Sequence, residues 1–180
     1  MIKRDFRADL AMSEAPDVVR AMKMACHAHW PELLNVYPAH TDNDRLGVDY
    51  WLEFPQGKLE ALDVKVRQKD WSLYGDDRTA CLELVSNTRT GKVGWTLDRD
   101  KRTDWVMFFY IETGKAFVYN ARQLRSSVMT HMPTLKASGK PSVQSTANYQ
   151  SESLFVSHRE LGAAIYRHSH VTSNMKAIAA

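Results

Sequence analysis

The sequence predicts an α/β fold, of the α+β kind, in which helices flank a central mixed sheet of about five strands. One helical pattern of apolar residues lies near the N-terminus, several runs with strand-like alternation fill the middle, and helical patterns return after residue 120. The 180 residues are 44% hydrophobic and 25% charged, a mixture typical of one globular domain with its own core. We therefore expect a single domain over 1–180, with a basic helical C-terminal part from about 121.

The first predicted helix begins at residues 13–17, where Ser13 is suited to cap it and Pro16 is tolerated in the first turn. Pro31 is expected to end this helix. Its apolar stripe recurs at helical spacing and comprises Val18, Val19, Met22, Cys26 and Trp30.

Five strands are predicted next, at 46–54, 59–66, 79–85, 105–111 and 115–119. The first two form a hairpin around a turn at 55–58, and the last two are joined by a short turn that contains Gly114. These runs supply the central sheet.

The C-terminal part is predicted to begin with Asn120 capping a helix over 121–129, which ends at Pro133 at the latest. Residues 135–151 are rich in Ser, Lys, Gln and Asn, so we expect a mobile loop there. Ser157 and Glu160 fit a capping box that opens a last helix, to about Tyr166.

The net charge of +3 is unevenly distributed: residues 1–120 carry 17 Lys+Arg against 19 Asp+Glu, and residues 121–180 carry 7 against 2. This basic part is compatible with contacts to a phosphate backbone, although charge alone does not indicate nucleic-acid binding. Cys26 and Cys81 form no Cys-x-x-Cys pair, and no apolar stretch resembles a signal peptide or a membrane span. A cytoplasmic protein without a membrane partner is expected.

A possible site lies in the first hairpin. Asp49 alternates with the apolar residues of its strand, and Asp63, Lys65 and Arg67 alternate with those of the next strand. A three-residue loop with Gly57 in the left-handed region would set Asp49 opposite Asp63 or Lys65, on one face. A loop with an even number of residues would put them on opposite faces.

Two carboxylates and a lysine are a minimal set for phosphodiester hydrolysis. Carboxylate oxygens hold Mg²⁺, which neutralises charge on a scissile phosphate. A lysine ammonium can orient or help deprotonate the attacking water and offset negative charge at phosphorus. In an arbitrary protein, however, Asp63 and Lys65 would more often form an ion pair on a solvent-facing strand.

Residues 47–50 (Gly-Val-Asp-Tyr) and 63–65 (Asp-Val-Lys) resemble the PD-(D/E)XK nuclease superfamily, which has a restriction-endonuclease-like core. The resemblance covers about 40–125, because 82–87, 93–95 and 103–106 are similar to later strands of small phage and mobile-element members. Val48 stands where the motif has proline, and the second acid is Asp instead of the commoner Glu.

The resemblance implies that Mg²⁺ or Mn²⁺ is coordinated by Asp49, Asp63 and the carbonyl of Val64, with Lys65 catalytic. Members usually add a Glu from the first helix, but here Glu14 stands at the start of that helix and Glu32 beyond its end.

Further candidates surround this set. Glu83 interrupts an apolar strand and is either another metal ligand or the exposed face of an edge strand. Arg67 is either a contact to substrate phosphate or a solvated strand end. Lys136 and Lys140, in the expected loop, are candidate phosphate contacts. Base stacking is a minor alternative to core packing for Trp51, Trp71, Trp95 and Trp105.

The function expected from these residues is metal-dependent hydrolysis of phosphodiester bonds, by an endonuclease or an exonuclease, in DNA more than RNA. A homodimer is compatible with this chemistry, and a phage-encoded protein would act in the host cytoplasm. Two alternatives have no catalysis: a degenerate member that binds nucleic acid without cutting it, and a phage-type protein that binds a host enzyme through the same fold.

Overall fold

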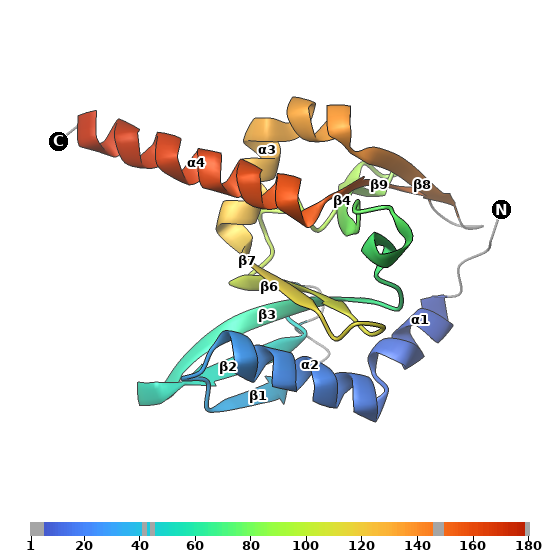
Figure 1. Ribbon diagram of the computed structural model, residues 1–180, viewed down its shortest axis with the longest axis vertical. Coiled ribbons are helices and arrows are strands. Elements are labelled where there is room, and N and C mark those ends of the chain that lie inside the picture. The colour runs from blue at the N-terminus through green and yellow to red at the C-terminus, as the bar shows by residue number, and fades with distance from the viewer. Residues whose placement is uncertain (1–5, 41–42, 44–45, 146–149, 179–180) are drawn as a thin grey trace. The chain divides into compact units, whose positions relative to one another are not determined.

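The structure, a computed structural model, describes the backbone of residues 6–40, 43, 46–145 and 150–178, and the side chains from 10 to 169 within these ranges. It is a mixed α/β fold with a five-stranded mixed sheet and flanking helices, so the predicted fold class is confirmed (Figure 1). The chain groups into two compact units, one made of residues up to Asp70 with Lys101–Val118, the other of Trp71–Asp100 with the residues from Tyr119 onward.

The first unit is built around the five-stranded sheet, in the order β1-β2-β3-β6-β7. Its elements are α1 (Phe6–Ser13), α2 (Pro16–His29), β1 (Asn35–Pro38), β2 (Tyr50–Phe54), η2 (Pro55–Gly57), β3 (Lys58–Arg67), β6 (Trp105–Tyr110) and β7 (Ala116–Asn120). The sheet is mixed because β3 pairs antiparallel with β2 and parallel with β6.

The core of this unit lies between α2 and one face of the sheet (Figure 1). Val18, Met22 and Cys26 are spaced four residues apart, so they share one side of α2 and are buried as predicted. They pack against side chains that alternate along the strands, among them Leu52 and Leu62, which are fully buried. The opposite face of β3 is therefore the one that carries Asp63 and Lys65.

The start of the first helix differs from the prediction. Ser13 ends α1, where its hydroxyl donates to the carbonyl of Leu10 at 2.8 Å, so it does not cap α2. Helix α2 begins at Pro16 without a side-chain cap. It ends at His29, which agrees with the end predicted before Pro31. Strand β1 was not predicted, and it supplies the fifth strand of the sheet.

The second unit contains a separate antiparallel sheet in the order β5-β4-β9-β8. Its elements are η3 (Trp71–Tyr74), β4 (Ala80–Asn87), β5 (Lys92–Val93), α3 (Ala121–Ser138), β8 (Lys140–Ser145), β9 (Gln150–Val156) and α4 (His158–Ile178). The prediction that 79–85 joins the central sheet was wrong, because β4 pairs with β5 and β9. The described residues form nine strands in two sheets, where about five in one sheet were expected.

The mobile loop predicted over 135–151 was also wrong. Helix α3 continues through Pro133 to Ser138, and the missing amide hydrogen is accommodated by a kink at His131, with φ −105° and ψ 17°. Strands β8 and β9 then follow. Strand β8 lies at the edge of its sheet and none of its residues is fully buried, so its polar composition resembles that of a loop. Residues 146–149 of the predicted loop lie outside the described residues.

The predicted caps of the two C-terminal helices are confirmed. Asn120 accepts a hydrogen bond from the amide of Gln123 at 3.1 Å, and Ser157 and Glu160 form the reciprocal capping box. Helix α4 is longer than predicted. Both cysteines are buried and free, as their spacing predicted. Over the described ranges, no helix combines the length and the apolarity that a membrane crossing requires.

Candidate active site

The β2–β3 hairpin determines the geometry of the site. Its turn is the three-residue segment Pro55–Gly57, with Gln56 (φ 65°) and Gly57 (φ 73°) both in the left-handed region. The turn closes on the pair Phe54 and Lys58, and the register runs to Tyr50 opposite Leu62. Asp49 directly precedes β2, and continuing the same register by one residue sets it opposite Asp63. The first of the two predicted registers is therefore confirmed.

Asp49 is fixed at the end of β2 by the backbone of β3. Its amide donates to the carbonyl of Leu62 at 2.9 Å, and its Oδ2 accepts the amide hydrogen of Val64 at 2.7 Å. The Asp63 carboxylate lies close enough for its negative charge to raise the pKa of Asp49. The predicted convergence of the two acids is confirmed.

Lys65 lies on β3, like Asp63, and its side chain is on the same face of that strand as the Asp63 carboxylate. Its Nζ lies 2.6 Å from Oδ1 of Asp63, whose side chain is only 6% exposed. The residues beside this pair on β6 are Val106 and Phe108, both buried. An ion pair next to apolar neighbours interacts more strongly than one in water. The solvent-facing alternative for Asp63 is therefore excluded.

Burial and, after it, the negative charge of Asp63 raise the pKa of Asp49 from its ordinary 3.8 to about 7. The Lys65 ammonium and the Val64 amide act in the opposite direction. Two carboxylates held this close repel each other when both are ionised, so near neutral pH the pair retains a proton or needs a second positive charge. A bound cation would satisfy that need.

Arg67 continues the same row on β3, beside Tyr110 of β6. Its Nε is buried and has no hydrogen-bond partner. Leaving a buried donor unsatisfied costs about 1 to 3 kcal/mol, more for a charged group, so such atoms usually mark a missing partner. An anionic ligand at this face would supply it.

The loop before Asp49 is held by the segment that leads into β6. The Arg102 amide donates to the carbonyl of Leu46 at 2.9 Å, and the Thr103 hydroxyl donates to the carbonyl of Gly47. Gly47 has φ +73°, and a Cβ there would lie 2.7 Å from Cδ of Lys101. Lys101 therefore crosses directly over Gly47, two residues before Asp49. Sequence reasoning missed Lys101, because no local pattern relates it to Gly47.

Asp104 fixes the register of β6 against β3. Its amide donates to the carbonyl of Ala61 at 3.0 Å, and its Oδ2 accepts the Ala61 amide at 2.8 Å. The following Trp105 donates its indole N–H to Glu60 at 2.6 Å. These bonds brace the strand that carries Asp63 and explain why a Thr-Asp-Trp segment stands before β6.

The donor set suits a hard divalent cation. Asp49 and Asp63 offer carboxylate oxygens, and the N–H and C=O of Val64 point to the same side of the strand, toward Asp49. Within the described residues no cluster of three or more His, Cys, Asp or Glu side chains forms, so the set there is two acids and a carbonyl. Glu83 lies in β4 of the second unit and is not part of the cluster that the first unit builds by itself.

The other candidates occupy different elements from those expected. Lys136 lies in the last turn of α3, and Lys140 is the first residue of β8; both are exposed. Glu14 lies between α1 and α2, where its charge contributes to raising the pKa of Tyr50, after burial, Asp49 and Cys26. Glu32 lines an open pocket of about 390 Å³ with Trp30, at the turn end of the hairpin. It lies away from the Asp49 end of β2.

Comparison with known proteins adds no relative. No protein-family model matches the chain, and searches of curated proteins and of solved structures find no significant match.

Proposed function

We propose that the protein is a metal-dependent nuclease or phosphodiesterase of the PD-(D/E)XK type, and that Asp49, Asp63 and Lys65 perform the catalysis. The observation that carries this proposal is the register that sets Asp49 opposite Asp63, with the Lys65 ammonium 2.6 Å from Asp63. The charge of Asp63 acts on Asp49, whose pKa is raised, and Lys65 stands beside them on a face with apolar neighbours. Such a cluster stabilises the fold poorly and suits catalysis well.

Each residue has a separate role in this proposal. Asp49 and Asp63, with the Val64 carbonyl, would hold Mg²⁺ or Mn²⁺, which when bound would neutralise charge on the scissile phosphate. Asp49 is held in place by the Val64 amide, so its free oxygen is already oriented. Lys65 orients the attacking water and offsets the charge that develops at phosphorus.

Nucleic acid is the substrate that best fits the remaining charges. The unsatisfied Nε of Arg67, on the face of Asp63 and Lys65, is suited to a phosphate oxygen. The second unit carries 11 Lys+Arg against 7 Asp+Glu, whereas the first carries 13 against 14. A basic unit fused to a carboxylate site supports a polyanionic substrate, with DNA favoured over RNA by the family resemblance.

The test is incubation of the purified protein with plasmid, linear, single-stranded and branched DNA and with RNA, in Mg²⁺, in Mn²⁺ or in EDTA. We expect metal-dependent cleavage of at least one substrate, lost in EDTA and in Lys65→Ala. The matched control is Lys115→Ala, which removes a lysine that pairs with Asp70 at the far end of β3. Wild-type protein that binds DNA but cleaves nothing in either metal would instead support the degenerate binder.

A further inference from the structure

The turn η3 exposes three large apolar side chains in four consecutive positions. Trp71, Leu73 and Tyr74 are 53%, 56% and 57% exposed. The rings of Trp71 and Tyr74 lie 5.8 Å apart at 62°, so both present ring surface at the same turn. Aromatic side chains normally bury 150–250 Å² each, so their exposure together marks a surface for a ligand.

Exposure on this scale distinguishes Trp71 from the other tryptophans. Trp30 is buried, and Trp51, Trp95 and Trp105 are at most partly exposed. All five tryptophans of the chain lie in the described ranges. The exposed indole is therefore a feature of η3 alone, and the sequence pattern does not distinguish it from the four others.

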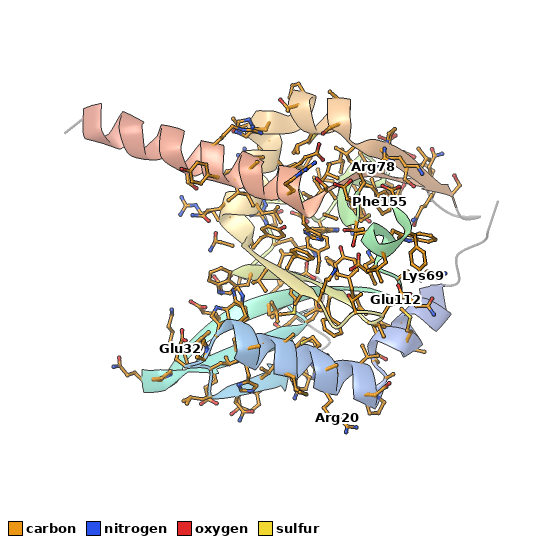
Figure 2. The ribbon with its side chains drawn as sticks, in the orientation of Figure 1. Arg20, Glu32, Lys69, Arg78, Glu112 and Phe155 are labelled. Carbon is orange, nitrogen blue, oxygen red and sulfur yellow. The ribbon has the colours of Figure 1, made fainter. Side chains whose placement is uncertain are left out.

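Two cations belong to the same part of the second unit. The Asp76 amide donates to the Trp71 carbonyl at 3.2 Å, which ties the following loop to η3. Arg78, which is labelled in Figure 2, bonds to Asp76 at 2.8 Å, and the pKa of Asp76 is lowered first by Arg78 and also by the charge of Lys140. Arg78 thus lies in the loop that is tied to η3, and the charges of Lys140 and Asp77 act on the Arg78–Asp76 pair.

We infer that η3 is a stacking platform for unpaired bases, with Trp71 and Tyr74 contacting the bases and Arg78 and Lys140 contacting the adjoining phosphates. Exposed aromatic rings with neighbouring cations are the arrangement by which proteins hold single strands. Bases inside a duplex already stack on each other and offer no free faces. The ligand class is therefore single-stranded nucleic acid, or a duplex with unpaired nucleotides.

This inference rests on the proposed function only in taking nucleic acid as the ligand, and it narrows the substrate class. It concerns binding, so it is tested in EDTA, where no metal-dependent cleavage occurs. Because Trp71 is the exposed tryptophan, quenching of tryptophan emission by a stacked base would report mainly on η3.

The experiment titrates the protein with a 20-nucleotide oligothymidylate and with a blunt duplex of equal length, following tryptophan emission and fluorescence anisotropy of labelled DNA. Wild type should bind the single strand more tightly than the duplex, with quenching. Trp71→Ala and Tyr74→Ala should each weaken single-strand binding about 5- to 100-fold, the scale of one stacked base. Trp71→Phe, which keeps a ring, should retain most of the affinity.

Tyr166→Ala is the matched control, because Tyr166 is 65% exposed on α4 of the same unit, and it should bind like wild type. Equal affinity of Trp71→Ala and wild type for the single strand, with circular dichroism showing both folded, would overturn the inference. So would a change in self-association in Trp71→Ala without a change in DNA binding, which would assign η3 to a protein contact. Cleavage without quenching would contradict the stacking platform at η3 but not the proposed nuclease activity. Quenching without cleavage would support the platform and contradict the nuclease activity.

Discussion

The ammonium of Lys65 lies 2.6 Å from Oδ1 of Asp63, and the two side chains project from the same face of β3. The charge of Asp63 also acts on Asp49, so Asp63 lies between Lys65 and the second carboxylate of the site. The two partners have different duties in the proposed mechanism. Substituting them separately should therefore give different results.

Lys65→Ala should lose at least about 10²-fold in cleavage rate while metal binding persists, because the lysine acts on water and phosphorus and is not a ligand. Removing the ammonium leaves Asp63 without its cation, so we also expect about 1 to 3 kcal/mol of lost stability. Steady-state cleavage and calorimetric metal titration measure the two effects. Lys65→Met keeps the apolar stem but also lacks the ammonium, so it should show the same rate loss, and its destabilisation should report the lost ion pair without lost packing.

Asp63→Asn should abolish metal binding and cleavage together, because a neutral amide oxygen is a poor ligand for a hard dication. The measurement is calorimetry with Mg²⁺ and with Mn²⁺, alongside the cleavage assay. Asp100→Asn, at an exposed position, is the control and should leave both unchanged. If wild type itself shows no metal site and Asp63→Asn binds DNA more tightly, the carboxylates only repel phosphate and the catalytic proposal fails.

Asp49 should make stability depend on pH without metal. Its pKa is about 7 when folded and near the ordinary 3.8 when unfolded, so between these values the folded state binds a proton that the unfolded chain does not. The free energy of unfolding should therefore fall as pH rises from about 4 to 7. Asp49→Asn should flatten this dependence, as urea denaturation at a series of pH values would show.

Metal provides the internal control for the pH experiment. At pH 8, Mg²⁺ should stabilise wild type, because a ligand that binds only the folded state shifts unfolding by mass action. Asp49→Asn should gain no such stabilisation. A wild-type stability curve without slope between pH 4 and 7 would contradict the raised pKa of Asp49.

The site could be predicted from the sequence because its signals are local. Alternation in the two strands and a three-residue turn with Gly57 leave two registers, with Asp49 opposite Asp63 or Lys65, and the pairing of β2 with β3 follows the first. Lys101 over Gly47 joins residues far apart in the chain, so no period reveals it. Strand β8 was missed for another reason: Lys140–Ser145 is a polar edge strand, whose composition is also that of a loop. Its pairing with β9 is a tertiary effect.

Lys136 and Lys140 now lie on different elements, so their contributions should separate. Replacing both with Gln should weaken binding of all DNA sequences alike and reduce the slope of log K against log salt by about two. Lys140→Gln should account for most of the loss in single-strand affinity, because its charge acts at Asp76 beside η3. Filter binding at several salt concentrations tests this, and unchanged binding of the double variant would remove both lysines from the interface.

A substitution of Arg67 tests whether this residue binds a ligand or supports the sheet, because the two roles predict opposite effects on the free energy of unfolding. Its Nε is buried without a partner, so the folded protein already bears the cost of that unsatisfied donor. Arg67→Met keeps much of the side-chain volume and removes the charge. We therefore expect an unchanged or slightly higher free energy of unfolding together with weaker DNA binding, whose salt slope falls by about one.

Arg102→Met, at an exposed position of the same unit, is the control and should change neither quantity. Loss of stability in Arg67→Met with unchanged DNA affinity would make Arg67 a structural residue of the sheet, and the unsatisfied nitrogen would need another explanation.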